Sequence, residues 1–562
     1  MKKFMVLTSI LFLFTFFSYV SAQSNEDFSY VISNSENWRD VYSTMHYANL
    51  LQKGNDFLVS TQHGNVLLLG ISKSNEIRVI SSNSQSFVVN YPLIIRNNGF
   101  ADAHEINVRN ANLELIEELS EINNFIIVGN IYGYNAIAVN PYALLTDSWV
   151  FMADKNNIAE IESILQNRDV NDVLIYGHVD REVRDALTGY DPKIISTGDR
   201  FKDNIEIVKE FLKIKEANQV TLTNGEFIEK GIMSDSYPIL FTGKENVPSQ
   251  IKDYLKESPF QVGVLVGSDL VGTATNIRRD TGMSVIVKFA RGARVPSGAI
   301  AAVEGLDIFP VPNPVMALSL HSVKYNAANS ELQVTYQSQS NIPIYLLGTI
   351  TPIIDGTQMS RIGDEEPIFM APEDFKTVIY PDFQVSGEDL EANIFTLYGD
   401  TPSSLEKVLD ATAKIERVNV IDNCDVDILN VKYSKPKDSF IVTLENTADA
   451  DCWASVEIKD LVVDGLEKTI GSEGSENIKK GKKGKVIINE ILANEDLDMN
   501  NFVDVIVYYG EREDSLVNTI RGTFELDIES ISKVTIVLLI ISLLIVGLII
   551  FYVIKRRNEN FL

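Results

Sequence analysis

The 562-residue sequence contains few of the residues that form reactive centres. It has two cysteines, five histidines and three tryptophans. The histidines are scattered, and no HExxH, GxSxG or GxxxxGK[ST] motif occurs. These absences argue against a zinc peptidase, an α/β-hydrolase and a P-loop NTPase. Each histidine is interpreted as a surface or core residue, and no catalytic residue is expected.

Several attachment and modification signals are also absent. No Asn is followed two positions later by Ser or Thr, so the common N-glycosylation acceptor does not occur. No LPxTG-like sequence precedes the C-terminal apolar stretch, and no lipobox cysteine follows the N-terminal one. Attachment by a sortase or by a lipid is therefore not indicated.

Basic residues are much less frequent than acidic ones. The chain has 49 lysines and arginines against 77 aspartates and glutamates, a net charge of -28. Both ends are basic, and without them residues 23–532 carry -33. Such a surface repels nucleic acid and anionic lipid and attracts cations. No nucleic-acid partner is therefore expected.

Two acidic stretches are candidate binding sites for one cofactor, Ca²⁺. They are "GDEEPIFMAPEDF" (363–375) and "NEDLDMNNFVD" (494–504), both rich in oxygen ligands. The second lacks the glycine and the terminal Glu of an EF-hand loop. No cofactor is expected apart from Ca²⁺ at these loops, where solvated surface is the competing interpretation.

The N-terminus has the plan of a signal peptide. Two lysines precede an apolar run, and small residues follow at Ser21 and Ala22. Cleavage after Ala22 is expected, with an uncleaved anchor as the alternative. Residues 1–22 therefore direct the chain to export.

The C-terminus predicts a single-pass membrane anchor. Val534 to Ile554 is 21 residues without a charge, long enough to cross the bilayer as a helix. It contains Gly547 but no GxxxG pattern, so a packed helix dimer is not indicated. The positive-inside rule places residues 555–562 in the cytoplasm and the preceding chain outside. The basic residues that follow the span are Lys555, Arg556 and Arg557.

The two cysteines, Cys424 and Cys452, lie in one late domain. In an oxidising exterior such a pair is expected to form a disulfide. Without a nearby histidine, a metal site is the weaker interpretation.

From residue 124 to about 290, short apolar runs alternate with amphipathic stretches, as in βα units around a largely parallel sheet. The units also repeat. "IIVGN" matches "TLTN" at an offset of 94, "LLTD" matches "LFTG" at 96, and Gly177 matches Gly267 at 90. The expected modules are α/β repeat 1 at 124–198 and α/β repeat 2 at 199–309. Residues 23–123 are expected to form a β-rich α/β module, with "DFLVST", "NVLLLGIS", "EIRVISS" and "SFVVNYPLIIR" as strands.

The segment "IISTGDRFKDNIEIVKEFLK" (194–213) predicts a strand, a turn and an amphipathic helix that joins the two repeats. Asp199 stands just before the helix, where its carboxylate can accept from free backbone amides. A ligand-binding turn is the alternative; the pattern favours a structural joint.

Gly198, Asp199, Arg200 and Phe201, followed later by "YPILFTG", resemble the cell-wall-binding type 2 repeat. That repeat occurs in tandem in surface-layer and other cell-surface proteins. The resemblance implies a surface scaffold whose repeat residues are not catalytic. This copy has Asp203 and Asn204 where the family has Thr and a small residue, so polymer binding is not implied.

After "GLDIFPVPNP" the pattern changes to strands of alternating hydrophobicity. Prolines at 310, 312 and 314 predict a stiff extended hinge. Residues 310–415 and 416–529 are each expected to form an immunoglobulin-like β-sandwich. Two sandwiches between a membrane helix and distal α/β modules are interpreted as a stalk.

These features favour a structural cell-surface protein of the S-layer type, anchored in the membrane and assembling laterally with copies of itself. A membrane tail in place of a wall anchor fits an archaeal envelope. The alternative is a surface receptor or adhesin that binds a glycan or small solute through its α/β modules. An exported hydrolase ranks third, and the protein is expected not to be an enzyme.

Overall fold

A computed structural model describes residues 28–267, 270–289, 292–294, 303–305, 307–530, 542 and 544–549. The expected signal peptide lies outside these ranges, as do most of 534–554 and all of 555–562. Val534, Ile554, Lys555, Arg556 and Arg557 are thus undescribed, while Gly547 lies in a short helical stretch. Within the described ranges no helix has the length and apolar character needed to span a membrane.

The chain divides into two compact units after Ala111. The first unit ends ahead of the predicted boundary at residue 123. Its sheet has four parallel strands in the order β2-β1-β3-β4. Its elements are β1 (Tyr30–Asn34), α2 (Trp38–Leu50), β2 (Gly54–Phe57), α3 (His63–Leu67), η1 (Leu68–Gly70), β3 (Glu76–Ser82), α4 (Tyr91–Asn97) and β4 (Asp102–Val108).

The expectation of a β-rich module is wrong for two of the four runs, and only the first two residues of "DFLVST" belong to a strand, β2. "NVLLLGIS" forms most of α3 and all of η1, and "SFVVNYPLIIR" ends in α4. A short apolar run does not separate a buried strand from a buried helix by periodicity alone. Pro92 was the available signal, because proline lacks the N–H that the first helical turn leaves unpaired.

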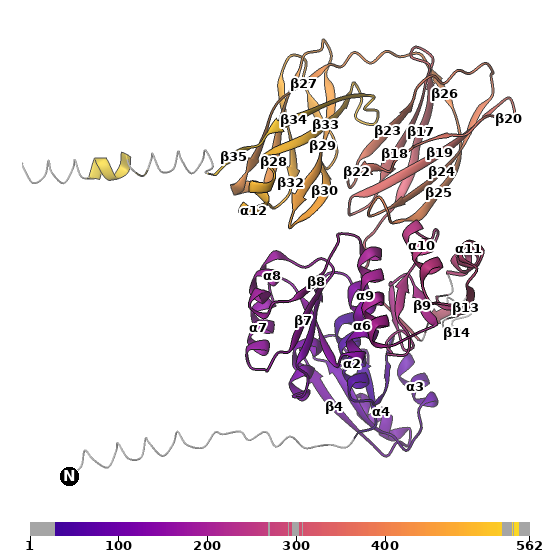
Figure 1. The fold of residues 1–562 in the computed structure, drawn as a ribbon, viewed down its shortest axis with the longest axis vertical. Coiled ribbons are helices and arrows are strands. Elements are labelled where there is room, and N and C mark those ends of the chain that lie inside the picture. The colour runs from indigo at the N-terminus through magenta and orange to yellow at the C-terminus, as the bar shows by residue number, and fades with distance from the viewer. Residues whose placement is uncertain are drawn as a thin grey trace, which may run out of the picture. The chain divides into compact units, whose positions relative to one another are not determined.

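The second unit begins with another four-stranded parallel sheet, in the order β6-β5-β7-β8. Figure 1 shows α7 and α8 on one side of this sheet and α6 and α9 on the other. β6 is buried along its whole length, as expected for a strand covered on both faces. The elements are α5 (Ala111–Glu114), η2 (Leu115–Glu118), β5 (Asn124–Gly129), α6 (Tyr134–Leu145), β6 (Ser148–Ala153), α7 (Ile158–Gln166), β7 (Asp172–Tyr176), α8 (Arg181–Leu187), η3 (Thr188–Tyr190), β8 (Lys193–Ile195) and α9 (Arg200–Ile214).

A third parallel sheet follows, in the order β11-β9-β12-β13. Residues 224–238, between β9 and β11, carry the short β10 and turns in place of a crossover helix. The elements are β9 (Gln219–Thr223), β10 (Phe227–Glu229), β11 (Ile239–Phe241), α10 (Ser249–Glu257), β12 (Val262–Val266), α11 (Val271–Thr281), β13 (Ser284–Lys288), β14 (Gly292–Arg294), β15 (Val303–Gly305) and β16 (Ile308–Pro310).

The expectation of tandem parallel α/β modules is confirmed, and the first unit is a third copy with the same strand order. Two of the three sequence anchors of the repeat align equivalent positions. Asn130 and Asn224 follow the first strands, and Gly177 and Gly267 follow the third strands with positive φ. The third anchor is wrong, because "LLTD" ends helix α6 whereas "LFTG" contains strand β11.

The rest of the chain is nearly all strand, in two modules that share one plan. Each has two sheets around one apolar core, so each is a β-sandwich. In both, the first and last strands pair in parallel, β17 with β26 and β27 with β35. Both first strands also carry a bulge, at Leu320/Ser322 and at Ile428/Asn430. The immunoglobulin-like label stays a prediction.

Sandwich 1 extends past its predicted end at residue 415, because β26 belongs to its sheet. Its strands are β17 (Leu318–Asn326), β18 (Glu331–Ser338), β19 (Ile344–Ile354), β20 (Thr357–Gln358), β21 (Ile362–Gly363), β22 (Ile368–Met370), β23 (Phe375–Tyr380), β24 (Leu390–Gly399), β25 (Leu405–Lys414) and β26 (Glu416–Val418).

Sandwich 2 contains the disulfide, which joins Cys424 to Cys452 as predicted. Both cysteines are buried in the core of this module. Its elements are β27 (Val426–Ser434), η5 (Lys435–Lys437), β28 (Ser439–Asn446), β29 (Cys452–Val463), β30 (Leu466–Gly471), β31 (Glu476–Ile478), β32 (Lys483–Asn489), α12 (Asn494–Met499), β33 (Phe502–Gly510), β34 (Asn518–Glu525) and β35 (Asp527–Glu529).

The proline segment is extended, but it is not a free hinge. β16 pairs with β10, and Pro310 stands opposite Phe227. Beyond it, Val311 N–H donates to Glu226 O, and Gly133 N–H donates to Pro312 O. The segment is thus bonded to both α/β modules of the second unit.

Candidate functional site: charged junctions between modules

The Asp199 carboxylate is the centre of the first junction, between α9 and sandwich 1. Its Oδ1 accepts from the backbone N–H groups of Phe201 and Lys202, at 2.9 and 3.2 Å, which makes it the N-cap of α9. Asp199 also accepts from the loop that joins β24 to β25. Those donors are the hydroxyls of Thr401, Ser403 and Ser404, at 2.9, 2.6 and 2.8 Å.

The same carboxylate is held ionised. Asp199 is buried, which by itself disfavours the charged form. The three hydroxyls and Gln250 Nε2 outweigh burial, and they lower the pKa of Asp199 below its ordinary value. A charged cap of this kind stabilises both the helix and the loop of the neighbouring module.

Arg200 enters the same junction. Its side chain is 8% exposed and forms ion pairs with Asp400, at 3.2 Å, and with Glu406. Burial raises the pKa of Glu406 to about 7, with Arg200 opposing that rise and Asp400 adding to it. Burial raises the pKa of Asp400 as well, again against Arg200. Burial would lower the pKa of Arg200, but Glu406 and Asp400 raise it overall, so the guanidinium stays charged.

The turn itself explains the residue types around these charges. Gly198 has φ of +80°, a conformation that side-chain-bearing residues adopt only at a cost. Phe201 is buried, and Asn204 is fully buried. Asn204 Nδ2 donates to Ile239 O and its Oδ1 accepts from Phe241 N–H, so α9 is fastened to β11.

A second junction joins α8 to sandwich 2. Arg181 pairs with Asp464 and with Asp496, the latter at 2.5 Å, and Arg184 pairs with Asp464 at 2.6 Å. Asp496 Oδ2 also accepts from Ala493 N–H at the start of α12. Hydrogen bonds from Arg181 and two backbone amides outweigh burial and lower the pKa of Asp496.

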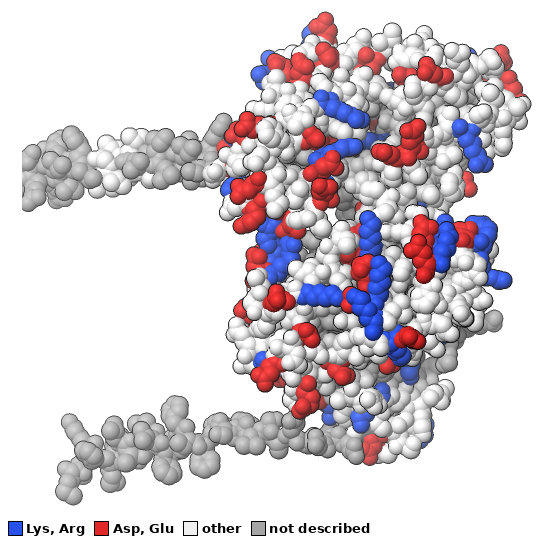
Figure 2. Space-filling view, viewed as in Figure 1, with Lys and Arg blue, Asp and Glu red and all other residues white. Residues whose placement is uncertain are grey.

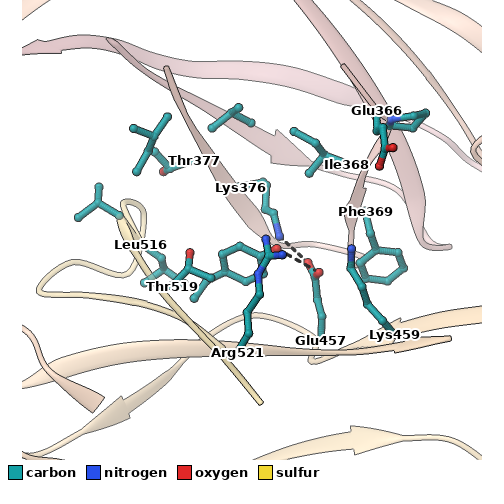
Figure 3. Close-up of a pocket in the computed structure, with 15 residues that line it drawn as sticks. Glu366, Ile368, Phe369, Lys376, Thr377, Glu457, Lys459, Leu516, Thr519 and Arg521 are labelled. Carbon is teal, nitrogen blue, oxygen red and sulfur yellow. Dashed lines mark hydrogen bonds and ion pairs between the residues drawn. The ribbon is translucent and has the colours of Figure 1, made fainter. Parts of the chain in front are cut away.

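A third junction joins the two sandwiches. Lys376 of β23 pairs with Glu457 of β29, and both side chains are more than nine-tenths buried (Figure 3). Tyr508 donates its hydroxyl to the other Glu457 oxygen at 3.2 Å, and Lys376 Nζ lies 3.3 Å from the centre of its ring. His321 and Asp514 add a more exposed contact at 3.1 Å.

The three junctions form a closed set of contacts within the second unit, meaning that the α/β part contacts both sandwiches and the sandwiches contact each other. α8 binds sandwich 2, α9 binds sandwich 1, and the sandwiches bind each other. The sandwiches are therefore joined to each other and to the α/β modules by side-chain contacts as well as by the chain, and the stalk stays a prediction. Arg181 and Asp464 meet across 283 residues, which no local sequence pattern signals.

Of the predicted site residues, Gly198, Asp199, Arg200 and Phe201 are brought together at the first junction. Sequence reasoning missed their partners in "DTPSSLE" (400–406), although three hydroxyls between two acids in a short connection were a usable signal. It also missed Arg181, Asp464 and the Lys376–Glu457 pair.

No group of three or more candidate metal ligands occurs among the residues that the structure describes. In the two acidic stretches some carboxylates have protein partners. Asp364 accepts from Gly348 N–H and from the Tyr380 hydroxyl, and Asp504 accepts from Thr523. Figure 2 shows basic side chains interspersed with acidic ones over the visible face, without a continuous basic patch.

No family model matches this chain, and no curated protein matches it. Solved structures with some similarity include Cwp8 and Cwp6 from Clostridium difficile, each 14% identical, with TM-scores of 0.37 and 0.38. The alignments cover 46% and 45% of this chain and 48% and 44% of those chains, so the chain spans about half their length. Another is the ligand-binding region of serine-glutamate repeat protein A of Enterococcus faecium, at 14% identity and a TM-score of 0.15, covering 20% of this chain and 100% of that one. Similarity this low transfers no function.

Proposed function

We propose that this chain is a structural protein of the cell surface, exported by its N-terminal segment, anchored by residues 534–554, and assembled laterally with copies of itself outside the cell. The proposal includes an S-layer-type arrangement and no enzymatic activity. The single observation that carries it is the closed set of charged junctions in the second unit.

A rigid molecule can pack into a regular lateral array. A lateral array needs each molecule to present its contact surfaces at fixed positions, and domains joined by linkers alone move relative to each other. Here, buried and half-buried charge pairs join two α/β modules and two sandwiches to one another. The disulfide and the negative surface suit an exterior compartment and a soluble exported chain.

The test is assembly of the purified full chain on a lipid monolayer, with and without Ca²⁺, followed by negative-stain electron microscopy. Ordered sheets are expected. Arg200→Gln opens the first junction and should reduce the order of the sheets. Lys209→Gln, on the exposed side of the same helix, is the matched control and should leave them unchanged.

Discrete, separate molecules at high surface density under both conditions would overturn the proposal. If sheets of the Arg200→Gln and Lys209→Gln variants were equally ordered, the junctions would no longer support lateral assembly.

A further inference from the structure

A cavity of about 300 Å³ lies between the two sandwiches. Sandwich 1 lines it with β22, β23 and the residues just before β22; sandwich 2 lines it with β29, β33, β34 and the connection before β34. It is partly open to solvent. Its volume lies at the lower end of the range for small-ligand sites in proteins.

The floor of the cavity is the outer face of the β29–β33–β34 sheet. Strand register places Glu457 opposite Ile506, and Ile506 opposite Arg521, so these three share a face. Tyr508 and Thr519 form the adjacent row on the same face. Lys459 follows Glu457 by two positions and therefore points to the same side.

The charges on this floor are not equivalent. Glu457 has both oxygens engaged, one by Lys376 and the other by Tyr508. Among the described residues, no carboxylate lies within ion-pair distance of Lys459 or Arg521, and both are exposed. Figure 3 shows Arg521 and Lys459 beside the Lys376–Glu457 pair, with Glu366 farther off in this view. Asp504, opposite Lys459 in the sheet, accepts from Thr523 and does not line the cavity.

We propose that this cavity binds a carboxylate-bearing sugar unit, of the uronic acid type, with Arg521 and Lys459 pairing with its carboxylate. A guanidinium binds a carboxylate in a planar, two-bond geometry, and an ammonium adds a second positive charge. Two cations exposed in one cavity of a protein with net charge -28 form a local site for an anion.

The remaining walls suit a sugar ring. The Thr519 hydroxyl supplies a hydrogen-bonding group, and so does the Thr377 hydroxyl, which also bonds to the Thr335 hydroxyl. Ile368 and Phe369 supply apolar surface. The part open to solvent leaves room for the next units of a polymer. The ligand therefore binds between the sandwiches, away from the α/β modules, and the inference does not depend on lateral assembly.

The test is isothermal titration of the full chain with glucuronate, with glucose and glucose 6-phosphate as comparison ligands. Glucuronate is expected to bind at least tenfold more tightly than glucose or glucose 6-phosphate. Arg521→Gln and Lys459→Gln should each weaken glucuronate binding at least tenfold with an unchanged melting temperature. Lys485→Gln, an exposed lysine on β32, is the matched control and should bind as the natural chain does.

Equal binding of glucose would overturn the role of the carboxylate, and equal or tighter binding of glucose 6-phosphate would overturn the uronic acid assignment. Binding that survives both cavity substitutions would place the ligand elsewhere and refute the site.

Discussion

Replacing Asp199 by Asn removes the negative charge on which the first junction converges while keeping the shape and the helix cap. Three hydroxyls from the β24–β25 connection donate to this carboxylate. A hydrogen bond to a charged group contributes about 1.5–3 kcal/mol and a neutral one about 0.5–1.5. The loss is thus about 1 kcal/mol for each bond, or about 3 kcal/mol for the junction.

Asp203→Asn is the matched control on the same helix. Burial raises the pKa of Asp203 to about 6, so the neutral form is already present near that pH. Its Oδ1 accepts from Thr197 N–H at 2.7 Å, which an Asn oxygen also does. The expected cost at pH 6 is less than about 0.5 kcal/mol, within the range of mild substitutions.

The assay is hydrogen exchange measured by mass spectrometry at pH 6, on peptides covering residues 196–214 and 400–406. Local opening is the appropriate quantity, because a chain of several modules has no single two-state unfolding free energy. About 3 kcal/mol corresponds to roughly 100-fold faster exchange in both peptides for Asp199→Asn. Equal exchange in the two variants would show that the Asp199 charge does not hold the first junction together.

Three further substitutions test other contacts of the second unit. The pKa of Glu406 is about 7 in the folded protein and 4.5 ordinarily, so between these pH values the folded protein binds a proton that the unfolded protein does not. The free energy of unfolding should therefore rise as pH falls from 7 towards 4.5. Glu406→Gln should flatten this part of the plot of melting temperature against pH. Cys452→Ser removes the disulfide that closes a loop of 28 residues and should lower the free energy of unfolding of sandwich 2 by about 3–4 kcal/mol. Unfolding in urea is measured by the fluorescence of Trp453, and an unchanged midpoint would contradict this expectation. Arg181→Gln leaves the Asp496 carboxylate without its cation and should speed hydrogen exchange in α12, whereas protection equal to that of the natural chain would show that the second junction contributes nothing.

The sequence predicted the elements whose signals are local. Strand-length apolar runs, the 3.6-residue period of α9 and the Asp199 cap each depend on residues within one segment. The apolar runs near residues 66 and 93 form short helices in which Val66 and Leu93 stay exposed, at 45% and 48%. A short apolar run does not by itself separate strand from helix, and Pro92 marks only the second helix. The third α/β copy was hidden for the same reason.

The junctions were not predictable in this way. Arg200 was visible in its turn, but its partners Asp400 and Glu406 lie in another module, 200 residues or more away. Lys376 and Glu457 stand in ordinary strands, and nothing in their neighbours distinguishes them from surface charges. Such pairs are fixed by how folded modules meet, which no single-segment pattern encodes.

Electron cryotomography of the native cell surface tests lateral assembly most directly. A continuous layer of regularly spaced density is expected outside the membrane, and it should disappear when this chain is removed. A surface on which labelled copies of the chain stand singly, without a repeat distance between neighbours, would contradict lateral assembly.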